Sequence, residues 1–150
     1  MPAFVTFGRI LFAVLFLYSG AAKLLDLPST TASIGAKVVI PALVAPYATQ
    51  LEGITGMPTA QMLAIAVGSF EILAGLMIAF NLAARFFAIL LIIFVAAATF
   101  YFHDFWNQSS PENGKTLIDA LKNLSLIGAL FVIAGIGRRP RNNAPVYGEV

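Results

Sequence analysis

The chain contains no cysteine. Disulfide bonds, thiolate metal sites and thiol–disulfide exchange are therefore excluded within it. Charge is also scarce, because only 11% of the 150 residues are charged, whereas a globular domain carries about 25%. Any redox role must depend on a bound cofactor or on a partner, and most of the surface must face something other than water.

What the chain has instead is apolar sequence, with 59% hydrophobic residues and a mean hydropathy of +0.88. Four apolar segments are long enough to cross a bilayer, which takes about 20 residues. They cover residues 4–25, 59–80, 83–102 and 117–136. The first lacks the cleavage site of a signal peptide and is too long for one, so we interpret it as a retained span. The sequence predicts an all-α membrane protein, an antiparallel bundle of four transmembrane helices that forms one domain over residues 1–137 in the lipid bilayer.

The segment between the first two spans, residues 26–58, contains four prolines and three glycines. Proline and glycine at this density break long helices. Within the segment, the run Lys37–Tyr47 is apolar but too short to span a bilayer. We expect it to form a short interfacial or re-entrant helix after the first span. A second polar connection, residues 107–116, is predicted to be a loop.

Basic residues predict the orientation. Four spans place both termini on one side, together with Arg9, Arg85 and the arginines of a polar tail at residues 138–150. Since basic residues accumulate on the cytoplasmic side, we predict that both termini and this tail are cytoplasmic. The net charge is only +2 and the chain has no long basic run, which argues against nucleic acid as a partner.

Glu71 is the deepest charged residue in the four predicted spans. It lies about twelve residues into its segment, roughly 18 Å at 1.5 Å per residue, and so near the midplane. A charge there costs about 2.5–3.5 kcal/mol on insertion scales. Gly68 and Gly75 share its helix face and allow another helix to approach closely. We therefore expect Glu71 to point into the bundle.

Other polar and aromatic residues are expected in the outer half of the bundle, because helical spacing places them together on the faces of three spans. They are Phe16 and Lys23 on the first span, Thr99, His103 and Trp106 on the third, and Lys122 and Asn123 on the fourth. With Glu71 below them, these residues predict a polar pocket that opens outward.

The chemistry of this predicted pocket suits a quinone-like head group. Reduction of a quinone needs a proton donor at each carbonyl and an apolar slot for the ring. We assign proton transfer to Glu71 and His103, and polarisation of the carbonyls to Lys23 and Lys122. Thr99, Asn123, Trp106 and Phe16 would be further ligand contacts, and Phe12, Phe100 and Phe102 would also line the slot.

Plainer interpretations of the same residues stay open. The two lysines can extend to the lipid head groups, His103 and Trp106 can form an interfacial belt, and Glu71 can be a structural ion-pair partner. Arg9 and Arg85 are interpreted as topology anchors or structural residues. No metal-ligand spacing is present, so no metal site is predicted, and a single histidine argues against haem.

Several short motifs occur in order along the chain. They are Ser19–Leu24 after Arg9, Glu71–Gly75, Ala98–Phe100 after Arg85, His103–Trp106 and Lys122–Gly128. Together they resemble the DoxX family of small bacterial membrane proteins over about Phe7–Gly137. The resemblance implies a bacterial inner-membrane protein linked to quinone oxidoreductases, terminal oxidases or oxidative-stress complexes. It also implies a shared role for the polar positions that include Arg9, Lys23, Glu71 and Arg85.

Three functions are compatible with these features. The first is a quinone- or quinol-interacting component of an oxidoreductase or oxidative-stress system. The second is a non-catalytic membrane subunit that scaffolds or helps assemble such a complex, with other oxidoreductase subunits as partners. The third is transport of a small solute or protons, which four helices can support only as an oligomer.

Overall fold

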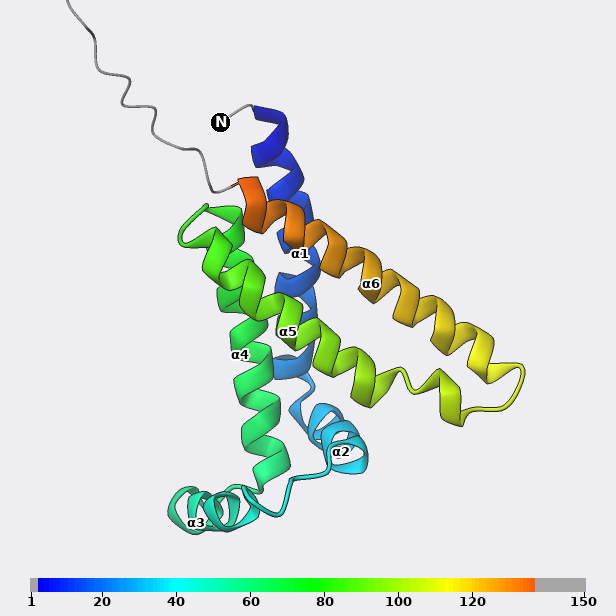
Figure 1. Ribbon diagram of the computed structural model, residues 1–150. Coiled ribbons are helices and arrows are strands. Elements are labelled where there is room, and N and C mark those ends of the chain that lie inside the picture. The colour runs from blue at the N-terminus through cyan, green and yellow to red at the C-terminus, as the bar shows by residue number, and fades with distance from the viewer. Residues whose placement is uncertain (1–2, 137–150) are drawn as a thin grey trace, which may run out of the picture.

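The computed structural model describes residues 3–136, which form six α-helices and one 3-10 helix, and these residues contain no strand (Figure 1). In chain order the elements are α1 (Ala3–Leu25), α2 (Leu27–Lys37), α3 (Ala45–Thr55), α4 (Thr59–Ala79), α5 (Ala84–Phe102), η1 (Phe105–Asn107) and α6 (Glu112–Ile136). The predicted all-α fold is confirmed. The predicted polar tail, residues 138–150, lies outside the described residues.

Four of these helices, α1, α4, α5 and α6, are long and apolar enough to cross a membrane, as the sequence predicts. One boundary was wrong, because α6 begins at Glu112 and not at residue 117. Part of the predicted loop is therefore the polar first turn of this helix, where the Thr116 hydroxyl donates to the Glu112 carbonyl at 3.1 Å. Hydropathy marks only the apolar part of a helix, so this turn was missed.

Helices α1 and α4 form the tightest pair, because glycines remove the side chains between their backbones. A methyl carbon placed on Gly20 of α1 would lie 2.5 Å from the carbonyl oxygen of Gly68 of α4. Farther along, a methyl carbon on Gly75 would lie 3.3 Å from the carbonyl oxygen of Ala13. The two helices therefore run antiparallel in close backbone contact, the arrangement that small residues permit in membrane helix pairs.

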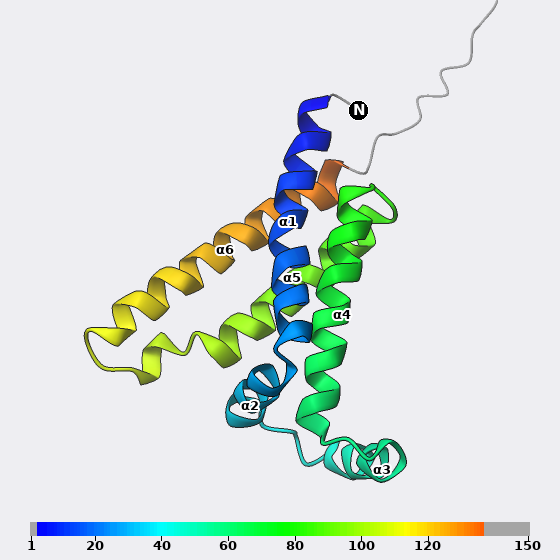
Figure 2. The ribbon, with the colours of Figure 1, turned by 180° about the vertical axis from the view of Figure 1, so that it is seen from behind.

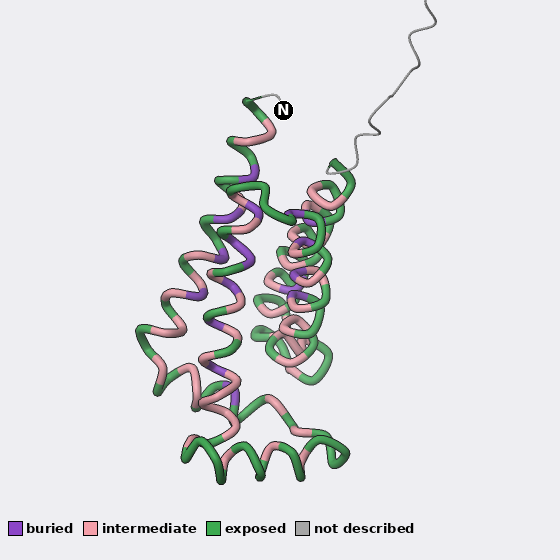
Figure 3. Tube along the Cα trace, turned by 90° about the vertical axis from the view of Figure 1, so that its left-hand side faces the viewer, coloured by how far each residue is buried: buried purple, intermediate pink, exposed green. Residues whose placement is uncertain are grey.

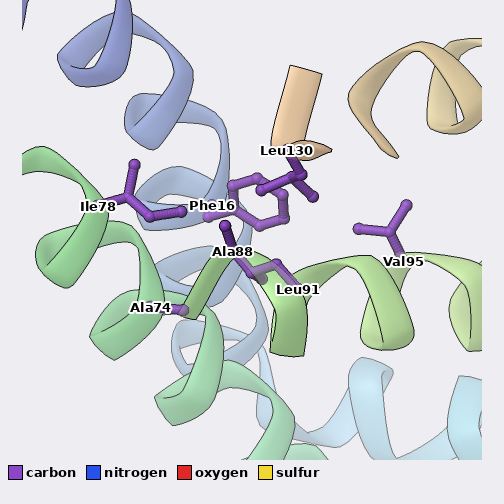
Figure 4. Packing of buried hydrophobic residues seen from close by; sticks show 7 residues of the cluster. All are labelled: Phe16, Ala74, Ile78, Ala88, Leu91, Val95 and Leu130. Atoms are coloured by element: carbon purple, nitrogen blue, oxygen red, sulfur yellow. The ribbon is translucent and has the colours of Figure 1, made fainter. Parts of the chain in front are cut away.

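Helices α5 and α6 form a second pair. The two pairs meet in one apolar cluster to which all four long helices contribute (Figure 4): Phe16, Ala74, Ile78, Ala88, Leu91, Val95 and Leu130. Away from this cluster, toward α2, the pairs diverge (Figures 1 and 2). Buried residues follow the contacts within and between the pairs, and the outward faces are exposed, as apolar helices facing lipid would be (Figure 3).

The segment between the first two spans holds two short helices, which confirms the predicted helical segment after the first span. Its predicted position over Lys37–Tyr47 was wrong. Helix α2 ends at Lys37 and α3 begins at Ala45, which leaves most of that apolar run as the connection between them. Pro28 and Pro46 do not break these helices, because each lies in a first turn, where no backbone donor is lost.

Polar side chains complete the ends of these helices. Asp26 precedes α2 and accepts a bond from the backbone N–H of Ser29 at 3.3 Å. Glu52 of α3 accepts bonds from both the backbone N–H and the hydroxyl of Thr59, each at 2.6 Å, and so caps the start of α4. These two bonds hold the pKa of Glu52 below its ordinary value of 4.5 and outweigh the small effect of burial.

Candidate functional site

A salt bridge between α1 and α4 lies where the two helices are closest. Lys23 Nζ donates to Oε1 and Oε2 of Glu71 at 3.1 and 3.0 Å, and to the Ser19 hydroxyl at 2.6 Å. The three protons of the ammonium group therefore all have acceptors. Glu71 is 3% exposed, and Lys23 offsets its negative charge. The predicted position of Glu71 inside the bundle is confirmed.

The salt bridge forms part of the wall of a cavity of about 500 Å³ between α1, α2, α4 and α5. This volume falls within the range of roughly 300–1,000 Å³ that is typical of small-molecule sites. The lining is mostly apolar, with Leu63 and Val67 from α4 and Phe94, Ala98 and Phe102 from α5 among its residues. A largely apolar cavity with a few polar groups in its wall is the usual form of a ligand site.

His103 lies in the cavity wall directly after α5, and its backbone N–H donates to the Thr99 carbonyl at 2.9 Å. The structure thus brings together three of the residues that the sequence predicts for the pocket, Lys23, Glu71 and His103. The next residue, Asp104, lies 3.5 Å from Lys37 Nζ at the end of α2. This pair joins α2 to the end of α5 beside two lining residues, His103 and Val38.

Helix α2 supplies polar lining residues that the sequence analysis missed, namely Ser29, Thr30 and Ser33. The Thr30 hydroxyl donates to the carbonyl of Lys23 at 3.1 Å and so holds α2 against the end of α1. A sequence signal for this face exists, because Ser29, Ser33 and Lys37 recur every fourth residue. It was passed over because the prolines in this segment were interpreted as helix breakers. Tyr101 of α5 was also missed.

Two other predicted ligand residues join α5 to α6. The Asn123 amide donates to the Thr99 hydroxyl at 3.0 Å, and that hydroxyl donates to the Val95 carbonyl at 2.7 Å. Neither Thr99 nor Asn123 is among the residues that line the cavity. Their bond instead fixes the pairing of the two helices.

The remaining predicted residues also lie away from the cavity lining. Lys122 is exposed on α6 and pairs with Asp119 at 2.9 Å. Phe16 is buried in the apolar cluster, and Trp106 is half-exposed and lies beside the rings of Phe100 and Phe105. The reason is that α6 packs mainly on α5. The four long helices therefore do not all converge above Glu71.

The two arginines assigned to topology or structure differ in their surroundings. Arg85, in the first turn of α5, is exposed. Arg9, in α1, is 7% exposed and faces the same side of its helix as Ala13, Phe16 and Gly20.

The chemical capacity of the cavity follows from its polar groups. Glu71 and His103 are side chains that can accept or release protons, and hydroxyl groups from α2 and Tyr101 can donate hydrogen bonds. The carboxylate oxygens of Glu71 each hold a lone pair beyond the one that Lys23 uses. The cavity can therefore hold a flat apolar group whose polar edge carries hydroxyl or carbonyl oxygens.

Comparison of the sequence with protein families gives a match to the family model described as DoxX over residues 4–104. Comparison with curated proteins and with solved structures gives no significant match. The matched residues include α1 to α5 and therefore the salt bridge, the cavity and His103, and they end before α6. The chain is a multi-pass membrane protein that belongs to the DoxX family.

Proposed function

We propose that the cavity binds the head group of a quinone or quinol, and that the protein is a component of an oxidoreductase or oxidative-stress system in the bacterial inner membrane. The observation that carries the proposal is the Lys23–Glu71 salt bridge in the wall of a mostly apolar cavity that also holds His103. The apolar lining accommodates the ring. Glu71 and His103 provide the groups that meet its oxygens, and Lys23 offsets the charge of Glu71.

The hydrogen bonds of the salt bridge favour the reduced form of the ligand. Because Lys23 uses all its protons on Ser19 and Glu71, it has none left for a quinone carbonyl unless one of those bonds is exchanged. Glu71, in contrast, retains acceptor capacity toward the cavity. A quinol hydroxyl can donate to this carboxylate without disturbing the pair.

Oxidation of a quinol to a quinone releases two protons and two electrons. Glu71 accepts one proton from one bound hydroxyl, and the His103 imidazole accepts the second proton from the other hydroxyl, since both residues line the same cavity. The electrons pass to a redox centre on another protein, because this chain has no cysteine and only one histidine with which to hold one. The proposal therefore includes a redox partner subunit in the same membrane.

We further propose that both termini face the cytoplasm. The start of α1 and the described end of α6 lie at the same end of the molecule (Figures 1 and 2), and Arg9 and Arg85 belong to that end. Basic residues favour the cytoplasmic side. A reporter that matures only in the cytoplasm, fused after Val150, would be active, and an inactive fusion would reverse the orientation.

The binding proposal is tested by titrating purified protein in nanodiscs with a short-chain quinol, followed by a change in melting temperature. The wild type should be stabilised, since a ligand that binds only the folded state raises its stability. Glu71→Gln should lose most of this shift, and Lys122→Gln, exposed on α6, should keep it. If no quinol or quinone stabilises the wild type, or if both variants respond equally, the proposal is wrong.

A second candidate is a non-catalytic membrane subunit, favoured by the complete pairing of Lys23 with Ser19 and Glu71. In that case the salt bridge locks α1 to α4 and the cavity needs no ligand. Glu71→Gln would then lose stability to the same extent with and without quinol. Purification from native membranes together with a stable partner would support this function.

A further inference from the structure

A buried charge lies in α1 away from the cavity. Arg9 is 7% exposed, and its Nε and Nη1 atoms are buried without a hydrogen-bond partner in residues 3–136. None of the three salt bridges formed by those residues includes it. A buried guanidinium without a partner is costly, because burial removes the water that would solvate its charge. An anion beside the guanidinium would therefore stabilise it, and residues 3–136 do not supply one.

The register of the α1–α4 pair locates Arg9. Ala13 lies against Gly75, and the helices are antiparallel. Arg9, one turn before Ala13, is therefore level with the last turn of α4, which ends at Ala79. The start of α1, the α4–α5 turn and the described end of α6 share this end of the molecule (Figures 1 and 2). Partial negative charge at the end of α4 offsets only part of the guanidinium charge.

No carboxylate of the described chain is available at this end. Among residues 3–136 the acidic residues are Asp26, Glu52, Glu71, Asp104, Glu112 and Asp119. Five of them lie at the opposite end or toward it, and Glu71 is paired with Lys23. Of the basic residues within 3–136, Arg9 and Arg85 lie at this end. The first turn of α5, which begins here, also has no side-chain cap, so its backbone N–H groups add donors.

We propose that Arg9 binds the phosphate of an anionic phospholipid in the leaflet at the end of the bundle where α1 begins. Arg9 lies six residues after the start of α1 at Ala3, roughly 9 Å along the helix axis, and so near the head-group region. A hydrogen bond between a guanidinium and a phosphate is charge-assisted and so roughly twice as strong as one between neutral groups. The phosphate of an anionic lipid supplies the negative charge that this end lacks among residues 3–136. The membrane holds this lipid at the depth of Arg9.

The site is tested with full-length, delipidated protein in detergent, to which phosphatidylglycerol or phosphatidylcholine is added. Bound lipids are counted by native mass spectrometry, and melting temperatures are measured in parallel. The wild type should bind phosphatidylglycerol in preference to phosphatidylcholine. Arg9→Gln should weaken phosphatidylglycerol binding by about fivefold or more. Arg85→Gln, exposed at the same end, is the matched control and should weaken it less.

Three outcomes would overturn the assignment. Equal phosphatidylglycerol binding by the wild type and Arg9→Gln would remove Arg9 from the site. Equal stabilisation by inorganic phosphate or glycerol phosphate would replace the lipid with a free anion. Glu149 is the one acidic side chain of the sequence outside residues 3–136. A lower melting temperature of Arg9→Gln or Glu149→Gln without lipid would show that the chain itself supplies the partner. The proposal expects Arg9→Gln to melt no lower than the wild type in lipid-free detergent, because it removes an uncompensated charge.

Discussion

Lys23 and Glu71, which are 48 residues apart in sequence, form a salt bridge in which the ammonium lies 3.0 and 3.1 Å from the two carboxylate oxygens. The backbones of α1 and α4 are close enough for this pair because Gly20 and Gly68 face each other one turn away. The same pair joins the tightest helix contact of the described chain to the wall of the cavity. Stability and binding should therefore respond differently to changes at these residues.

The first prediction concerns the charge of Glu71. Breaking a fully buried ion pair costs about 3–5 kcal/mol. The Lys23 side chain is 31% exposed, and glutamine still accepts one hydrogen bond, so Glu71→Gln should lower the free energy of unfolding by about 1–3 kcal/mol. Denaturation in detergent without quinol would measure this loss. If the variant proves as stable as the wild type, the salt bridge does not hold the helices together.

The second prediction concerns the close contact of α1 and α4. Gly20→Ala would place a methyl group against the Gly68 carbonyl oxygen and Ile72. Because a backbone atom is in the way, the helices must separate, at a cost of about 1–3 kcal/mol. Gly128→Ala in α6 is the matched control, since nothing lies within 4 Å of its added methyl group. Equal melting temperatures for the two variants would contradict the packing described for this pair.

How much of the fold and of the candidate site could be predicted from the sequence depends on the kind of signal. The four spans follow from hydropathy, and Glu71 and Lys23 follow from the cost of charge in lipid and from helical spacing. The start of α6 at Glu112 could not be predicted in this way, because the turn outside the apolar stretch carries no hydropathy signal.

The other missed features depend on tertiary packing. Ser33 and Tyr101 reach the cavity only because α2 packs on the paired long helices, and periodicity within α2 does not say which neighbour it contacts. Lys122 was placed near Glu71 on the assumption that four spans surround one centre. In the structure α6 packs mainly on α5, and Lys122 turns toward Asp119 on an exposed face.

The third prediction concerns pH and the junction of α3 with α4. The pKa of Glu52 is lowered by the hydroxyl and backbone bonds from Thr59. The stabilisation that these bonds give is complete above the ordinary pKa of 4.5 and is lost as the pH falls through the lower folded-state pKa. A carboxyl titration followed by NMR should give a midpoint below 4.5 for Glu52. Thr59→Ala should raise it toward that value, and an unshifted midpoint in the wild type would disprove the cap.

The fourth prediction concerns the Lys37–Asp104 pair beside the cavity. The pair is partly exposed, and its separation is 3.5 Å, so it should contribute only about 0.2–1 kcal/mol to folding. Asp104→Asn should therefore change the melting temperature little. Because the pair ties α2 to the end of α5 at the cavity edge, the variant should release a bound quinol faster in stopped-flow measurements. An unchanged release rate would show that α2 does not control access.

The most direct test of the central claim is a high-resolution structure of the protein purified in native lipid, inspected in the cavity beside Glu71. The account predicts planar, ring-shaped density between α2, α4 and α5, with an oxygen within hydrogen-bond distance of the Glu71 carboxylate. A cavity that contains only water or a lipid acyl chain, with the Lys23–Glu71 pair unchanged, would contradict it.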